Sequence, residues 1–131
     1  MSAPSTLPGR WQMIRAEFAG AAAPELVVAC TVLHFTADRY SMVFNGVEAD
    51  AGSYVAEGDA ATRMLTLQAD KGPHTGRVVC CIYQLVGDRL RICYGLDGRT
   101  PTQFTTQADE PHYLATYRRC TEERDTVDSS V

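Results

Sequence analysis

The residues best suited to chemistry are an arginine and a glutamate two positions apart, Arg15 and Glu17. Side chains in a strand alternate between two faces, so both share a face with Trp11 and Met13 if residues 11–18 are extended. Inside a barrel, these two charges would pair with each other or lie in water at the mouth, because a buried unpaired charge is costly. Alternatively, they anchor a ligand's polar end, or Glu17 is a general acid or base and Arg15 stabilises oxyanion charge.

The sequence does not decide which face of this segment points inward, because the face opposite Trp11 is also largely apolar. That opposite face would carry Gln12, Ile14, Ala16 and Phe18. Only one of the two faces can line an interior, since the side-chain period of a strand is two residues. We take the face with Trp11 as the inward one.

Tyrosines in the middle of predicted strands are the second group of candidates, because each supplies ring area and a hydroxyl for a pocket wall. Tyr83 and Tyr94 flank the Gly87-Asp88 turn, where they could pair across a hairpin, so we predict them as the main pocket pair. The alternative for all of these tyrosines is ordinary filling of a barrel interior. The candidates are Tyr40, Tyr54, Tyr83 and Tyr94.

Composition argues against several classes of function. The chain has 12 Lys and Arg against 16 Asp and Glu, a net charge of −4, with no basic stripe for nucleic acid. We find no apolar leader and no run of about 18 apolar residues, so neither a signal peptide nor a membrane span is expected. Five cysteines without a leader favour reduced thiols and a cytoplasmic protein. Scattered histidines and absent phosphate or dinucleotide motifs predict no metal and no cofactor.

The elements that must position these residues are short β-type runs separated by turn residues. No connection offers the crossover of about a dozen residues that parallel strands need, so the runs form an antiparallel meander that closes as a barrel or packs as a sandwich. Residues 21–28 are the one plausible helical turn. We expect a flexible lead-in over 1–8, a folded body over 9–120 and a disordered acidic tail over 121–131. The predicted strands are 11–18, 31–36, 39–45, 51–56, 63–68, 76–86, 89–96, 103–106 and 112–119.

Gly9-Arg10-Trp11 resembles the Gly-x-Trp signature at the start of lipocalins. Over about 7–119, the chain resembles a family of small bacterial lipocalin-like (calycin-type) domains that mostly lack an assigned function. The resemblance implies an all-β, antiparallel, up-and-down barrel of eight strands with one short helical turn after the first strand. Further matching stretches are Leu33-His-Phe35, Gly52-Ser-Tyr54, Gly72-Pro-His-Thr-Gly76, the run from Ile82 to Cys93, Pro101-Thr-Gln-Phe104 and Tyr117-Arg-Arg119.

The same resemblance implies a structural contact at one end of the barrel. In lipocalins, an arginine of the last strand packs across the tryptophan of the signature, which here is Trp11. Arg119 is the candidate, with Arg118 as the alternative. The cation–π part of such a contact is worth about 0.5–2 kcal/mol. The chain departs from the family pattern at Thr66 and Thr100.

These observations lead to three hypotheses for function. The first is a protein that binds a small, largely apolar organic molecule inside the barrel, lined by Met13, Arg15, Glu17 and the four tyrosines. The second is an enzyme that uses the same cavity for acid–base chemistry such as isomerisation or cyclisation, with Glu17 and Arg15 as its catalytic groups. The third is a protein-interaction module with a packed interior. A homodimer through a barrel face is compatible with each.

Overall fold

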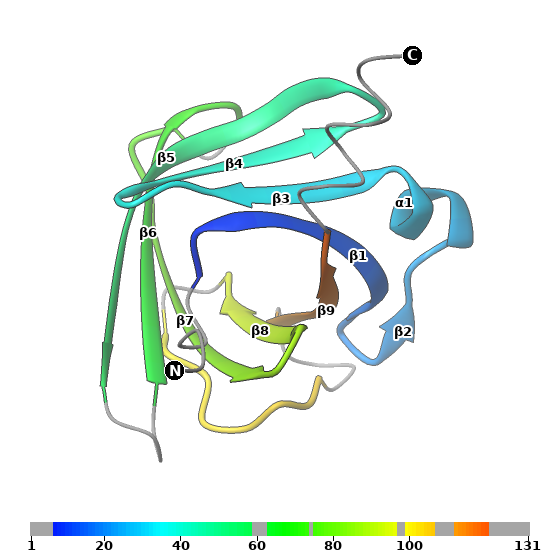
Figure 1. Cartoon of the computed structure of the whole chain (residues 1–131). Helices are drawn as coiled ribbons and strands as arrows, with labels where there is room; N and C mark the ends of the chain where they lie inside the picture. Colours follow the sequence, from blue (N-terminus) through cyan, green and yellow to red (C-terminus); the bar gives the residue numbers. More distant parts are fainter. Residues whose placement is uncertain (1–6, 59–62, 74, 97–98, 107–111, 121–131) are drawn as a thin grey trace.

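The computed structural model describes residues 7–58, 63–73, 75–96, 99–106 and 112–120. The predicted lead-in up to residue 6 and the acidic tail lie outside the described residues. Within the described ranges, strands dominate and one short helix follows the first hairpin (Figure 1). The elements are β1 (Gly9–Phe18), β2 (Ala21–Ala22), α1 (Glu25–Ala29), β3 (Thr31–Phe35), β4 (Arg39–Phe44), β5 (Val47–Gly58), β6 (Arg63–Lys71), β7 (Val78–Val86), β8 (Arg89–Gly95) and β9 (His112–Arg119).

The long strands form a closed antiparallel barrel. From β3 to β9 each strand pairs with the next one along the chain, and β1 pairs with both β3 and β9. β2 is a two-residue addition beside the end of β1. The predicted all-β, up-and-down barrel of eight strands with one helical turn is therefore confirmed. Closure leaves no long unpaired strand edge, which would otherwise invite pairing with other chains.

One predicted strand is wrong. Residues 103–106 belong to an irregular segment, 99–106, because β8 pairs directly with β9 and leaves no sheet edge for another strand. This 99–106 segment lies on the outer face of β8. The guanidinium of Arg91 lies 4.4 Å from the Phe104 ring centroid, and the Cys93 thiol is 3.9 Å from the carbonyl oxygen of Thr105. Cys93 is fully buried beneath it.

The first strand carries a β-bulge that reverses its alternation. The register with β9 shifts between Met13 and Arg15, so β1 contains one extra residue there relative to β9. Trp11, Met13 and Ala16 are buried, whereas Arg15 is exposed. The expectation that Arg15 and Glu17 face the interior is therefore wrong, because the extra residue moves both to the outer side. A bulge also bends a strand, and β1 curves strongly around the barrel in Figure 1.

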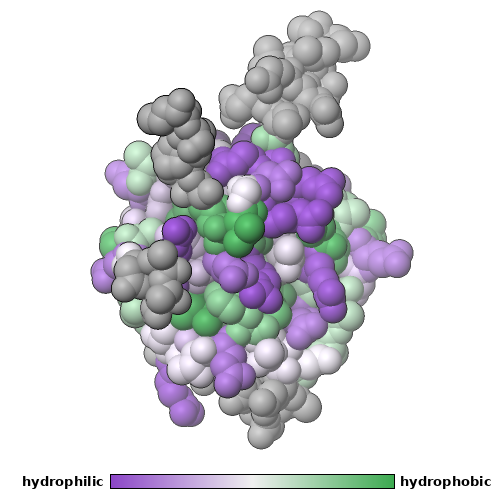
Figure 2. Space-filling view, turned by 60° about the horizontal axis from the view of Figure 1, so that its bottom comes forward, coloured by the Kyte–Doolittle hydropathy of each residue, from purple (hydrophilic) through white to green (hydrophobic). Residues whose placement is uncertain are grey.

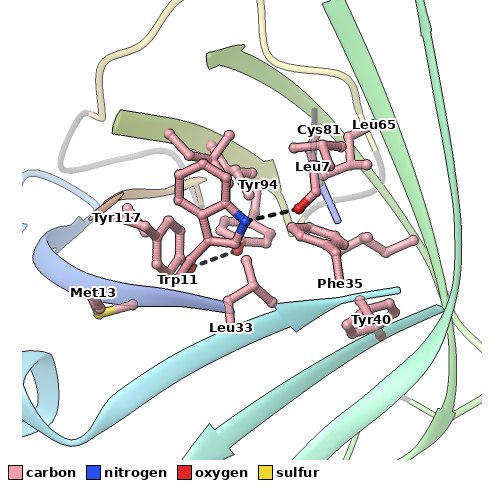
Figure 3. Packing of buried hydrophobic residues seen from close by; sticks show 14 of the residues in the cluster. Leu7, Trp11, Met13, Leu33, Phe35, Tyr40, Leu65, Cys81, Tyr94 and Tyr117 are labelled. Carbon is pink, nitrogen blue, oxygen red and sulfur yellow. Dashed lines mark hydrogen bonds between the residues drawn. The ribbon is translucent and has the colours of Figure 1, made fainter. Parts of the chain in front are cut away.

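Trp11 fills one end of the barrel. Its Nε1 donates a hydrogen bond to the carbonyl oxygen of Leu7 at 2.9 Å, and both side chains are buried (Figure 3). Of the two arginines left open by the sequence, Arg119 stacks on the indole, 4.3 Å from its centroid, and donates to the carbonyl oxygen of Pro8 at 3.0 Å. The predicted boundary of the lead-in is thus too late, since Leu7 and Pro8 already belong to this closed end. Gly9 has a φ of +136°, a backbone conformation that other residues rarely adopt, and a Cβ on it would also lie 2.7 Å from Arg119 Nη1.

The face of the molecule seen in Figure 2 is mixed in polarity. Figure 2 shows hydrophilic residues in broad areas that are interrupted by smaller hydrophobic ones. Several exposed apolar side chains are valines at strand ends, such as Val47 and Val86. Scattered exposed apolar residues are normal for a protein surface, although Val47 has the exposed Phe44 as its partner across the β4–β5 hairpin. The homodimer suggested by the sequence stays a prediction.

Candidate functional site

The half of the interior that lies away from Trp11 contains a cavity of about 410 Å³. Phe44, which is 40% exposed, belongs to its wall, so the cavity reaches the surface at this mouth of the barrel. The apolar wall residues include Met13, Leu33, Phe35, Met42, Leu65, Leu67, Val79, Ile92 and Leu96, and the polar ones are Thr31, Tyr40, Asp50, Tyr94 and Tyr113.

One end of the barrel is filled and the other is hollow. At the closed end, Trp11 packs with other large buried side chains such as Leu90. At the mouth, Ala49 and Val79 lie beside larger wall residues such as Phe44 and Tyr113. A small barrel has room inside either for packed side chains or for one small ligand. This barrel divides its length between the two.

Tyr40 and Asp50 place polar groups in the cavity from adjacent strands, β4 and β5. Tyr40 is buried, and one carboxylate oxygen of Asp50, Oδ1, is shielded from solvent. Burial raises the pKa of the Tyr40 hydroxyl well above its usual value, and the negative charges of Asp50 and Asp70 add to the effect. The hydroxyl is therefore protonated at neutral pH and can donate or accept a hydrogen bond.

Tyr94 forms a buried hydrogen-bonded pair with Tyr117. Their hydroxyl oxygens are 2.8 Å apart (Figure 3). The Tyr94 ring also packs against Tyr113 with centroids 5.7 Å apart. Burial raises the pKa of both hydroxyls in the pair, so both are neutral. The Tyr113 hydroxyl lies 3.9 Å from the sulfur of Met13. Tyr94 and Tyr113 line the cavity from β8 and β9, which are opposite β4 and β5 in the sheet order, whereas Tyr117 is not part of the wall.

Removing one hydroxyl of this pair should destabilise the fold. Tyr117→Phe leaves the Tyr94 hydroxyl buried without its present partner, which should cost about 1–3 kcal/mol of unfolding free energy. Replacing both tyrosines removes donor and acceptor together, so the double variant should lose less than the sum of the single losses. Urea unfolding of the wild type, both single variants and the double variant measures the coupling. Additive losses would show that the hydroxyl contact contributes nothing.

Two of the predicted tyrosines lie elsewhere. In the hairpin register, Tyr83 is opposite Ile92 and Tyr94 is opposite Cys81, so the proposed direct pairing of the two tyrosines is wrong. Tyr83 packs against the core but is not part of the cavity wall, as the register places it nearer the closed end. Tyr54 contacts the Phe35 ring edge-on, with centroids 4.8 Å apart, and donates its hydroxyl to the Thr36 carbonyl at 2.7 Å.

Arg15 and Glu17 do not line the cavity. Both lie at a shallow outer depression beside α1. Glu17 accepts a hydrogen bond at 2.9 Å from the Thr106 hydroxyl, which itself accepts one from the Gly20 amide at 2.8 Å. Glu17 thus holds the end of the 99–106 segment against the outside of β1. Met13, by contrast, lines the cavity as predicted.

Of the polar residues in the cavity wall, sequence reasoning missed Thr31, Asp50 and Tyr113. Asp50 falls outside the predicted strand 51–56, whereas β5 begins at Val47 and brings Asp50 opposite Met42. Tyr113 lies in the correctly predicted last strand, two residues before the buried Ala115 and four before Tyr117. The alternation of apolar residues in that strand is the signal that could have found it.

Among the described residues, no group of three or more histidine, cysteine or acidic side chains is arranged to hold a metal ion. The five cysteines are free thiols. Within the same ranges, no helix has the length and apolar character to cross a membrane. Fold and site together define an eight-stranded antiparallel barrel with an internal cavity at one end. Comparisons with protein-family models, curated proteins and solved structures found no match.

Proposed function

We propose that the protein binds a small, largely apolar organic molecule in the barrel cavity. The observation that supports this most strongly is the cavity of about 410 Å³ with a mainly hydrocarbon and aromatic wall. Pockets for small organic molecules typically measure about 300–1,000 Å³ and combine such walls with a few polar groups. Here the hydroxyls of Tyr40 and Tyr113 and the carboxylate of Asp50 are the polar groups.

Membership of the lipocalin-like family is part of this proposal. The closed up-and-down topology and the Arg119–Trp11 contact support it. The catalytic alternative with Glu17 and Arg15 inside the barrel is not proposed again, because the bulge in β1 places both outside the cavity. The interaction-module alternative required a packed interior, whereas the mouth half of this barrel is hollow. A cytoplasmic location stays a prediction of the sequence.

Binding of a neutral apolar dye, N-phenyl-1-naphthylamine, tests the proposal. Val79 lines the cavity, while the adjacent Val78 is exposed on the other face of β7. Val79→Trp fills part of the cavity and should weaken dye binding at least about tenfold, because overpacking displaces the ligand or strains the wall. Val78→Trp is the matched control and should bind the dye like the wild type. Fluorescence titration measures both affinities.

The proposal is contradicted if the wild type does not enhance dye fluorescence, or if both tryptophan variants bind equally well. Circular dichroism establishes that each variant is folded. Leu96→Trp, at another half-buried wall position, replaces Val79→Trp if that variant does not fold.

A further inference from the structure

We propose that the ligand of the cavity is an uncharged carbonyl compound, such as a ketone or an ester, whose oxygen accepts a hydrogen bond from the hydroxyl of Tyr40. This inference rests on the proposed function and adds the polar group of the ligand to it. It comes from the hydrogen bonds that the hydroxyl groups of the cavity wall make within the protein.

Three of the four hydroxyl groups in the described cavity wall already have a partner. Thr31 donates to the carbonyl oxygen of Val27 at 2.6 Å. Tyr94 and Tyr113 make the contacts given above, with a second tyrosine and with a methionine sulfur. The fourth hydroxyl is that of Tyr40, which has no hydrogen-bond partner within the part of the chain that the structure describes.

The register of the strands explains why the Tyr40 hydroxyl lacks a partner. Phe35 of β3 and Gly52 of β5 lie opposite Tyr40, and neither has a side chain that accepts hydrogen bonds. The Tyr40 side chain is 4% exposed and belongs to the buried cluster drawn in Figure 3. Because burial raises the pKa of its hydroxyl, the group keeps its proton and stays a hydrogen-bond donor. The wall therefore offers a donor to the molecule that fills the cavity.

A carbonyl group suits this donor and the mainly apolar wall around it. Its oxygen accepts a hydrogen bond, and the group brings no proton that would need an acceptor of its own. A charged acceptor such as a carboxylate fits less well, since the described wall residues include no lysine, arginine or histidine to pair with it.

The same donor also selects against a ligand that is only hydrocarbon. The cavity reaches the surface, so water can bind the Tyr40 hydroxyl while no ligand is present. A hydrocarbon that displaces this water leaves the donor without an acceptor, which opposes binding. A ketone or an ester displaces the same water and replaces the hydrogen bond.

Three probes with one ten-carbon skeleton test the inference: butyrophenone, 1-phenylbutan-1-ol and butylbenzene. Each displaces the neutral dye, and its inhibition constant is measured on the wild type and on Tyr40→Phe. The ratio of the two constants cancels the different hydrophobicities of the probes. We expect Tyr40→Phe to weaken butyrophenone binding about three- to tenfold, the usual effect of one neutral hydrogen bond, and to weaken the alcohol less. Butylbenzene should bind at least as tightly as before.

Tyr83→Phe is the matched control, because Tyr83 packs against the core outside the cavity wall. It should leave all three constants unchanged. Urea unfolding gives an independent readout. Since the Tyr40 hydroxyl makes no hydrogen bond within the described part of the chain, Tyr40→Phe should unfold at the same urea concentration as the wild type or a higher one.

The outcomes separate this inference from the proposed function. If Tyr40→Phe weakens no probe, or weakens butylbenzene as much as butyrophenone, the hydrogen bond from Tyr40 is overturned while the binding function stands. Equal losses for the ketone and the alcohol overturn the carbonyl class. A Tyr40→Phe variant that is clearly destabilised or does not fold shows that the hydroxyl has a structural partner, which also overturns the inference. If neither the dye nor any probe binds the wild type, the proposed function fails and the inference fails with it.

Discussion

Replacing Trp11 with alanine is expected to lower the free energy of unfolding by about 3–5 kcal/mol, the usual cost of deleting a large buried aromatic side chain. The indole is 0% exposed and packs in the closed end of the barrel. Its loss removes the hydrogen bond to the Leu7 carbonyl and the stacking of Arg119 at 4.3 Å. The cavity left behind lies between rigid strands that can collapse only in part, which is why the loss should be near the top of the range.

Urea unfolding monitored by circular dichroism measures this loss. Arg119→Met is the informative companion variant, because it keeps much of the aliphatic packing on the ring while it removes the charge. It should cost about 1–2 kcal/mol, less than Trp11→Ala. Dye binding by folded Trp11→Ala should persist, since Trp11 does not line the cavity at the mouth. A loss below about 1 kcal/mol for Trp11→Ala would show that the closed end does not depend on the indole.

Substituting Gly95 with alanine should destabilise the protein and uncover Cys93. A Cβ at Gly95 would lie 1.9 Å from the Arg99 carbonyl oxygen and 2.8 Å from that of Cys80. Both atoms belong to the backbone, so the strand or the 99–106 segment must move. Overpacking of this kind costs about 1–3 kcal/mol or more. Because the 99–106 segment covers Cys93, its displacement should raise the alkylation rate of that thiol at least about tenfold.

The matched control for this change is Gly87→Ala. Gly87 has a φ of +60°, so alanine there is strained by about 1 kcal/mol, but its Cβ would meet nothing within 4 Å. This variant should lose stability without exposing Cys93. Peptide mapping by mass spectrometry after pulsed alkylation follows each cysteine separately, with the buried Cys81 as an internal reference. Equal protection of Cys93 in wild type and Gly95→Ala would disprove the covering role of the 99–106 segment.

The arrangement of strands could be predicted because its signals are local. Alternating apolar residues and short turns such as Asn45-Gly46 and Gly87-Asp88 place most strand boundaries within a few residues of those observed. Connections this short permit only antiparallel neighbours. The identity of the closed-end residues was also accessible, because Trp11 and Arg119 lie in the motifs on which the family resemblance rests.

The candidate site was predictable only in part. Met13, Tyr40 and Tyr94 were named from the sequence and line the cavity, whereas Arg15, Glu17, Tyr54 and Tyr83 do not. Asp50, which also lines the cavity, was not named because its strand was expected to start after it.

What the sequence by itself determined is the alternation within each strand and the order in which strands follow one another. Both depend on neighbouring residues alone. Only the tertiary structure decided where the alternation slips, as it does between Met13 and Arg15, and which residues of two strands lie opposite each other. Register and bulges depend on pairing with strands far away in the chain, and a slip of one residue exchanges the inner and outer faces. That exchange put Arg15 and Glu17 outside the barrel.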